Sequence, residues 1–341
     1  MGQEDMSLKE YVKDVQRYAD LWNGAVFHGR QLVRAEELTS ADAEQVHTKE
    51  KGQAVQTTQD IVMRQMKSGR TLALWVVENQ KEVDYSMPVR VMLEEALRYH
   101  EQVSSIKISN KRRWRKETKQ KKTGQTKVQV KEKECPSKKV FTDLKGQKVR
   151  PSEYLYKFCR SDKLFPVVTM VVYWSDKDWD GPRTLREMLQ LSGVDDLDKE
   201  LLKLVPEYPL HLVNLASLEH TEYFQTELRI VMDLYRLKES KEGWRNYVMS
   251  HEECKSIDYD TYKILNVLTS TEGLEQEKIE KGGKVNMCGA LLGIKEEGRE
   301  QGRLSELIDL VKEGVLELDY AAKRMQMTPE EFKDKMAVMN Y

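Results

Sequence analysis

The chain contains few cysteines, and none of them stands close to another. No CxxC pair occurs, so the zinc-finger pattern of paired cysteines and paired histidines is missing. This pattern excludes a cysteine-based zinc site and the disulfide framework of a small secreted protein. The cysteines are Cys135, Cys159, Cys254 and Cys288.

Long hydrophobic runs are also missing. The opening stretch, MGQEDMSLKEYVKD, is polar and acidic and does not resemble a signal peptide. No apolar stretch approaches the roughly 20 residues that a membrane-spanning helix needs. We therefore expect a soluble, cytoplasmic protein with no membrane partner.

Apolar residues are nevertheless plentiful enough to form a core. Of the 341 residues, 39% are hydrophobic and six are tryptophan. The length fits about two domains of ordinary size. The charged fraction of 33% is high for a globular protein but well below that of a disordered polyelectrolyte.

Positive charge is concentrated in one segment. Residues 107–133 hold 12 Lys or Arg but only two acidic residues, although the whole chain has a net charge of −1. Such a segment can neutralise phosphates by releasing counterions, and Trp114 inside it offers an indole for stacking on a base. The composition equally fits a solvated, partly disordered connector. The residues expected to contact DNA here are Lys111, Arg112, Arg113, Trp114 and Arg115.

The spacing of apolar residues predicts the elements of the N-terminal part. Residues 7–23 have helical periodicity, with Ser7 as the N-cap. Residues 60–66 and 71–80 are expected to form the two arms of a hairpin around a turn at 67–70.

Helices and strands then alternate. A helix is expected from Ser86, with Pro88 in its first turn. Residues 165–174 are a near-continuous β-branched run, which is typical of a strand buried on both faces. Further expected elements are a helix at 184–191, a strand at 210–215 and a helix at 222–237. This order predicts an α/β fold with a mixed central β-sheet flanked by helices.

Residues 295–341 are expected to be wholly helical. Gly298 and Gly302 weaken the start of this region unless another backbone packs against them. Thr328 offers an N-cap and Glu331 completes a capping box, which predicts two short helices joined by a tight turn. Such a pair fits a DNA-reading helix-turn-helix or a packing or dimerisation cap, and the cap is the commoner use.

Polarity changes abruptly within the stretch TLALWVVENQK, residues 71–81. Six apolar residues end at Val77, and a carboxylate and a carboxamide follow two residues apart. Because side chains alternate along a strand, Glu78 and Gln80 point to the same side.

A second carboxylate is expected beside this pair. If the hairpin turn centres on Ser68 and Gly69, Asp60 lies roughly opposite Glu78. Two carboxylates that meet at the end of a sheet suit Mg²⁺, with water and phosphate as the remaining ligands. Acidic pairs across strands also occur as solvated surface, and Gln80 could simply end the strand, so spacing alone leaves both interpretations open.

In their order and spacing these motifs resemble the PD-(D/E)XK nuclease superfamily, and more narrowly the Rpn-type recombination-promoting nuclease and transposase family of bacteria. That family has Glu-x-Gln where most relatives have Glu-x-Lys, followed by a Met-Pro-x-Arg helix start as in Met87–Arg90. Phe165–Trp174 and the following loop WDGP resemble the family's second strand-loop-helix block. Glu297–Arg303 and Ala321–Ala322 resemble its tail, although Gln326 stands where a turn glycine is expected, which weakens the helix-turn-helix interpretation.

The resemblance implies metal-dependent cleavage of DNA phosphodiesters by a restriction-endonuclease-like core. Asp60 and Glu78 would bind Mg²⁺, with Mn²⁺ or Ca²⁺ as alternatives, and the ion would polarise the scissile phosphate and lower the pKa of a bound water. Gln80 replaces the superfamily's lysine. It cannot titrate, but it can orient the attacking water through a hydrogen bond. These three residues form the expected catalytic set.

Further site residues follow from the same resemblance. Superfamily members often add an acid from the first helix, so Asp20 is the expected third metal ligand, with Glu37 as its rival. Arg90 would either grip a DNA phosphate or form an ion pair with Glu94 four residues later.

These inferences combine into one domain scheme. Residues 1–106 and 150–237 would form the nuclease-like core, 107–149 a basic, partly disordered insert, and 238–341 a helical C-terminal region. DNA is the expected partner, and the C-terminal helices are a candidate homodimer contact. The alternative function is a catalytically inactive DNA-binding or scaffold protein associated with a mobile element. A transposase that performs strand transfer would use similar acids.

Overall fold

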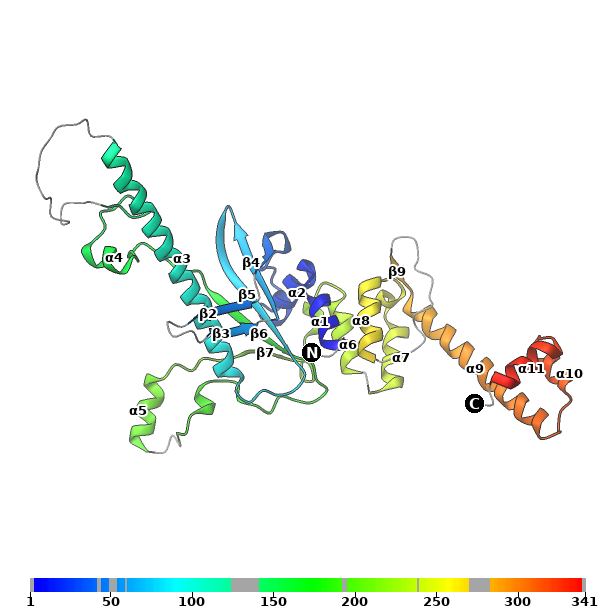
Figure 1. Cartoon of the computed structure of the whole chain (residues 1–341). Coiled ribbons are helices and arrows are strands. Elements are labelled where there is room, and N and C mark those ends of the chain that lie inside the picture. The colour runs from blue at the N-terminus through cyan, green and yellow to red at the C-terminus, as the bar shows by residue number, and fades with distance from the viewer. Residues whose placement is uncertain are drawn as a thin grey trace, which may run out of the picture. The chain divides into compact units, whose positions relative to one another are not determined.

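The chain folds into two compact units, Met1–Thr226 and Glu227–Tyr341 (Figure 1). The structure, a computed structural model, describes residues 3–41, 44–48, 54–58, 60–123, 141–191, 195–237, 239–269 and 283–338.

A five-stranded sheet in the order β1-β4-β5-β6-β7 forms the centre of the first unit. Its first three strands pair antiparallel, and β5, β6 and β7 pair parallel, so the predicted α/β class with a mixed sheet is confirmed. The strands are β1 (Leu38–Ser40), β4 (Ile61–Lys67), β5 (Arg70–Gln80), β6 (Val167–Tyr173) and β7 (His211–Asn214).

The hairpin of β4 and β5 forms as its turn residues predict. Ser68 and Gly69 have φ values of 49° and 74°. Positive φ at both central residues is the type I′ pattern, whose twist matches that of the flanking strands. Ile61 pairs with Val77, and this register carries Asp60 to the position beside Glu78.

β6 lies between two other strands, as its continuous apolar run predicts. Met170, Val171 and Val172 are fully buried because both faces of the sheet are covered here. A separate two-stranded antiparallel sheet, β2 (Glu44–Thr48) and β3 (Ala54–Thr58), was not predicted from the sequence.

The N-terminal helix differs from its prediction. It is split into α1 (Gln3–Val12) and α2 (Val15–Ala25). Asp14 starts the second helix, since its side chain accepts hydrogen bonds from the backbone N–H groups of Gln16 and Arg17. A single helix over 7–23 is therefore wrong.

The other helices of this unit include one that is much longer than expected. α3 (Met87–Thr123) connects β5 to β6 and extends far beyond the sheet, so residues 107–123 are helical (Figure 1). The short helices α4 (Pro151–Tyr156) and α5 (Asp196–Leu204) follow. The predicted helix at 184–191 is wrong, because only a single 3₁₀ turn at Arg186–Met188 forms there.

The second unit is mainly helical. The helix predicted at 222–237 begins only at Leu228, after a 3₁₀ turn at Thr221–Tyr223 in the first unit. One short antiparallel pair, β8 (Ile257–Asp258) with β9 (Lys284–Val285), joins the helices. The helices are α6 (Leu228–Arg236), α7 (Lys241–Ser250), α8 (Tyr259–Thr269), α9 (Met287–Lys312), α10 (Leu318–Arg324) and α11 (Pro329–Val338).

The C-terminal helices form a small core of their own. Phe332 of α11 packs into a cluster with Leu304 and Ile308 of α9 and Ala321 and Ala322 of α10. The predicted capping box is present, because the Thr328 hydroxyl accepts the N–H of Glu331 while the Glu331 carboxylate accepts the N–H of Thr328.

The turn between α10 and α11 has a left-handed residue. Gln326 adopts a φ of 56°, the conformation that glycine takes most easily. A glutamine thus occupies the position where the family resemblance led us to expect glycine.

None of the helices in the described part of the chain combines the length and apolar character that crossing a bilayer requires.

Candidate functional site

Asp60 and Glu78 meet where the β4–β5 hairpin ends. The backbone N–H of Asp60 donates to Glu78 Oε1 at 3.2 Å, and the N–H of Asn79 donates to Asp60 Oδ2 at 2.8 Å. The Glu78 side chain is 1% exposed and that of Asp60 is 18% exposed. The two carboxylates therefore form a pair that is closed toward the core and partly open on the Asp60 side.

Arg90 holds the buried carboxylate of Glu78 from the first turns of α3. Its guanidinium lies 3.0 Å from Glu78 Oε2, 3.3 Å from Glu94 Oε1 and 3.7 Å from Asp84 Oδ2. The ion pair with Glu94, one of two roles expected for this arginine, is thus present. Contact of Arg90 with a DNA phosphate stays a prediction.

Burial raises the pKa of Glu78 to about 8. The nearby carboxylates of Glu94 and Asp60 contribute to this rise, while the Arg90 guanidinium and the N–H of Asp60 oppose it. The balance is upward because the carboxyl is almost fully withdrawn from water. A cation that binds Glu78 at neutral pH therefore has to displace a proton.

The side chains of Asn79 and Gln80, the two residues after Glu78, point to opposite sides of β5. Asn79 Oδ1 accepts a hydrogen bond from the indole of Trp174 at 2.8 Å, which fastens the strand end to the segment after β6. The Gln80 carbonyl accepts the backbone N–H of Trp174 at 2.7 Å. The Gln80 side chain is half-buried and, by the alternation of the strand, lies on the Glu78 side.

The site offers few side-chain donors for the expected Mg²⁺ ion. No group of three or more His, Cys, Asp or Glu side chains that could hold a metal is found in the described residues. The pair Asp60 and Glu78 supplies two carboxylates. Mg²⁺ is commonly bound by one or two carboxylates together with waters and substrate phosphates, so the chemistry of the pair fits an ion that is completed by its substrate.

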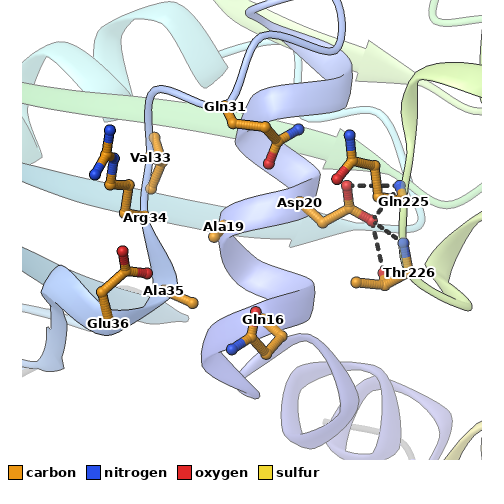
Figure 2. A pocket seen from close by; sticks show the side chains of 10 residues that line it. All are labelled: Gln16, Ala19, Asp20, Gln31, Val33, Arg34, Ala35, Glu36, Gln225 and Thr226. Carbon is orange, nitrogen blue, oxygen red and sulfur yellow. Dashed lines mark hydrogen bonds between the residues drawn. The ribbon is translucent and has the colours of Figure 1, made fainter.

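Asp20 has different partners from those predicted for a metal ligand. Its carboxylate accepts the backbone N–H groups of Gln225 at 2.8 Å and Thr226 at 2.7 Å, and the Thr226 hydroxyl at 2.6 Å (Figure 2). It lines a polar cavity of about 320 Å³. Among the described residues no group of three acids that could hold a metal is found, so the structure does not bring Asp20 together with Asp60 and Glu78.

Glu37, the rival to Asp20, is also engaged elsewhere. Its Oε2 accepts the carboxamide of Gln65 at 2.7 Å, and its Oε1 lies 3.7 Å from the ammonium group of Lys67. These contacts join the 3₁₀ turn at Ala35–Glu37 to β4.

Trp114 does not offer a free indole. It is 3% exposed, its ring lies 5.2 Å from that of Tyr154 and 5.9 Å from that of Phe141, and its Nε1 donates to the carbonyl of Thr142. Stacking on a base would require this cluster to open, so the structure corrects the expected role of Trp114 to that of a core residue.

Part of the expected basic insert, 107–149, is helical. Residues 107–123 belong to α3, and the side chain of Asn110 donates to Asp162 Oδ2 at 2.9 Å and to the carbonyl of Lys157 at 3.1 Å. The segment after residue 140 is thereby fastened to the distal half of α3. Residues 124–140 lie outside the described part of the chain.

Three of the predicted DNA-contacting cations remain exposed on α3. Lys111, Arg112 and Arg115 are exposed, whereas Arg113 is half-buried and donates to Asn110 Oδ1. At 100° per residue, Arg112 lies about 160° and Arg115 about 100° around the helix from Trp114, whereas Lys111 lies only about 60° from it. Lys111, Arg112 and Arg115 together form the basic stripe of α3.

Sequence reasoning missed Lys9. Its ammonium group on α1 lies 3.6 Å from Asp60 Oδ1, and its side chain is 29% exposed. A lysine among other charged residues near the start of the chain carries no sequence signal for this contact.

Comparison of the chain with protein-family models, with curated proteins and with solved structures finds no match in any of the three.

Proposed function

We propose that this protein is a Mg²⁺-dependent DNA endonuclease with a PD-(D/E)XK-type core. The observation that carries the proposal is the meeting of Asp60 and Glu78 at the end of the β4–β5 hairpin, with Gln80 on the same side of the strand. A bound divalent ion would supply Lewis-acid polarisation of the scissile phosphate and a more acidic water.

The chain's own residues would prepare that site. Asp60 and Glu78 would hold the ion, and the N–H of Asn79 fixes the orientation of the Asp60 carboxylate. Gln80 would accept a hydrogen bond from the attacking water and so orient it. Arg90 keeps Glu78 in place and also contacts Glu94 and Asp84.

Plasmid nicking tests this proposal. Purified protein is incubated with supercoiled plasmid and Mg²⁺, Mn²⁺ or Ca²⁺, beside Asp60→Ala and Glu78→Ala. The wild type is expected to nick in a metal-dependent way and both variants to fall to background. Glu82→Ala is the matched control, because Glu82 is an exposed carboxylate in the loop that follows β5. Nicking by Glu78→Ala at the wild-type rate would refute the site.

A catalytically inactive DNA-binding or scaffold protein is the second candidate. One observation favours it: each of the four oxygens of Asp60 and Glu78 already has a partner within the chain. Carboxylates satisfied in this way can serve stability alone. Calorimetric titration with Mg²⁺ or Mn²⁺ separates the two candidates, because a scaffold needs no affinity for metal at this pair.

A further inference from the structure

We propose that Lys9 is a positioning residue that supplies the positive charge which Gln80 does not bring to this site. The inference rests on the proposed nuclease function. The positive charge would come from α1, because the carboxamide of Gln80 in the strand motif carries no charge at any pH.

The position of Lys9 is fixed by the helix that carries it. Leu8, Tyr11 and Val12 of α1 are all buried, with exposed fractions of 1%, 4% and 0%. These anchors hold the helix against the core and leave Lys9 at the edge of the site. Its ammonium group lies 3.6 Å from Asp60 Oδ1, on the partly open side of the carboxylate pair.

Arg90, the cation that contacts Glu78, is already engaged. Arg90 lies within 3.7 Å of the carboxylates of Glu78, Glu94 and Asp84, so its charge is shared among three acids. Lys9 is paired with Asp60, the more exposed of the two predicted metal ligands. Of these two cations, Lys9 is therefore the better placed to balance the charge of an arriving phosphate.

A cation in this position has two opposite effects. Before substrate binds, it competes with a divalent ion for Asp60 and weakens metal binding through charge repulsion. When a phosphate is present, the same fixed charge stabilises the negative charge that develops on it. Removal of the charge should therefore tighten metal binding and slow cleavage, a combination that a merely structural role does not produce.

The experiment uses the full chain and three variants. Lys9→Gln removes the charge, and Lys9→Arg keeps it. Lys13→Gln is the matched control, because Lys13 directly follows the same helix and its ammonium group lies 3.7 Å from Glu10. Calorimetry measures the Mg²⁺ dissociation constant without DNA, plasmid nicking at saturating Mg²⁺ measures turnover, and thermal melting checks folding.

We expect Lys9→Gln to bind Mg²⁺ several-fold more tightly and to nick at least about tenfold more slowly, with an unchanged melting temperature. Lys9→Arg should recover most of the rate, and Lys13→Gln should match the wild type.

Two results would overturn the inference while leaving the proposed function intact. One is a Lys9→Gln variant that nicks as fast as an active wild type. The other is a variant whose Mg²⁺ affinity and melting temperature both fall, since that result would show a structural role. A wild type that does not nick, like Glu78→Ala, would instead refute the proposed function and this inference with it.

Discussion

At the scale of single residues, the charge of Glu78 is controlled by its burial. Its pKa of about 8 in the folded protein lies far above the ordinary value of 4.5. Between these two values the folded state binds more protons than the unfolded state. The free energy of unfolding therefore falls as pH rises through this window, by at most about 1.4 kcal/mol per pH unit.

Glu78→Gln should remove this dependence. We expect the variant to lose less stability than the wild type between pH 5 and pH 8, because its carboxamide has no proton to release. Urea unfolding followed by tryptophan fluorescence measures this, since five of the six tryptophans lie in the first unit. Parallel pH profiles for the two proteins would contradict the burial of a titrating Glu78.

Asp20 is the second residue whose role can be tested alone. Asp20→Ala leaves the N–H groups of Gln225 and Thr226 without their acceptor, which should lower the free energy of unfolding by about 1–3 kcal/mol. We expect the Mg²⁺ affinity of the folded variant to stay at the wild-type value, measured by calorimetry. A stable variant that has lost Mg²⁺ binding would instead make Asp20 the third metal ligand. The exposed Asp176 provides a matched control in Asp176→Ala.

At the scale of elements, α3 combines a structural face with a basic one. Trp114 and Asn110 fasten the segment after residue 140, while the three side chains of the basic stripe are exposed. Deletion of 107–133 would therefore remove core contacts together with charge. Substitution of the stripe alone is the cleaner test of DNA binding.

Replacing Lys111, Arg112 and Arg115 with Gln should weaken DNA binding without unfolding the protein. If all three contact phosphates, the slope of log affinity against log salt should become shallower by about 3. Fluorescence anisotropy with a labelled duplex at several salt concentrations measures the slope. Trp114→Phe is the companion variant, and it should leave the slope unchanged because the indole is buried. An unchanged slope in the triple variant would show that the basic stripe is a solvated helix face that does not contact DNA phosphates.

At the scale of the whole molecule, local patterns predicted more than distant contacts. The hairpin and its register followed from the turn at Ser68–Gly69 and from strand alternation, which placed Asp60 beside Glu78. These features depend on neighbours within about 20 residues along the chain. The same is true of the capping box of α11, where Thr328 and Glu331 are three residues apart.

The contacts that sequence reasoning missed join segments far apart in the chain. Lys9 reaches Asp60 from a helix about 50 residues earlier, and Trp114 is buried by rings at positions 141 and 154. The spacing of apolar residues within one helix or strand carries no information about such long-range contacts. The break at Asp14 is different, because an N-cap residue there was visible in the sequence and helical periodicity on both sides obscured it.

The central claim is that Asp60 and Glu78 hold a divalent ion with which the protein cuts DNA. The most direct measurement is the nicking rate of supercoiled plasmid in Mg²⁺ for the wild type and Glu78→Ala, with melting curves to establish that both are folded. The account predicts nicking by the wild type that chelation stops and none by the variant. Equal rates for the two folded proteins would contradict it.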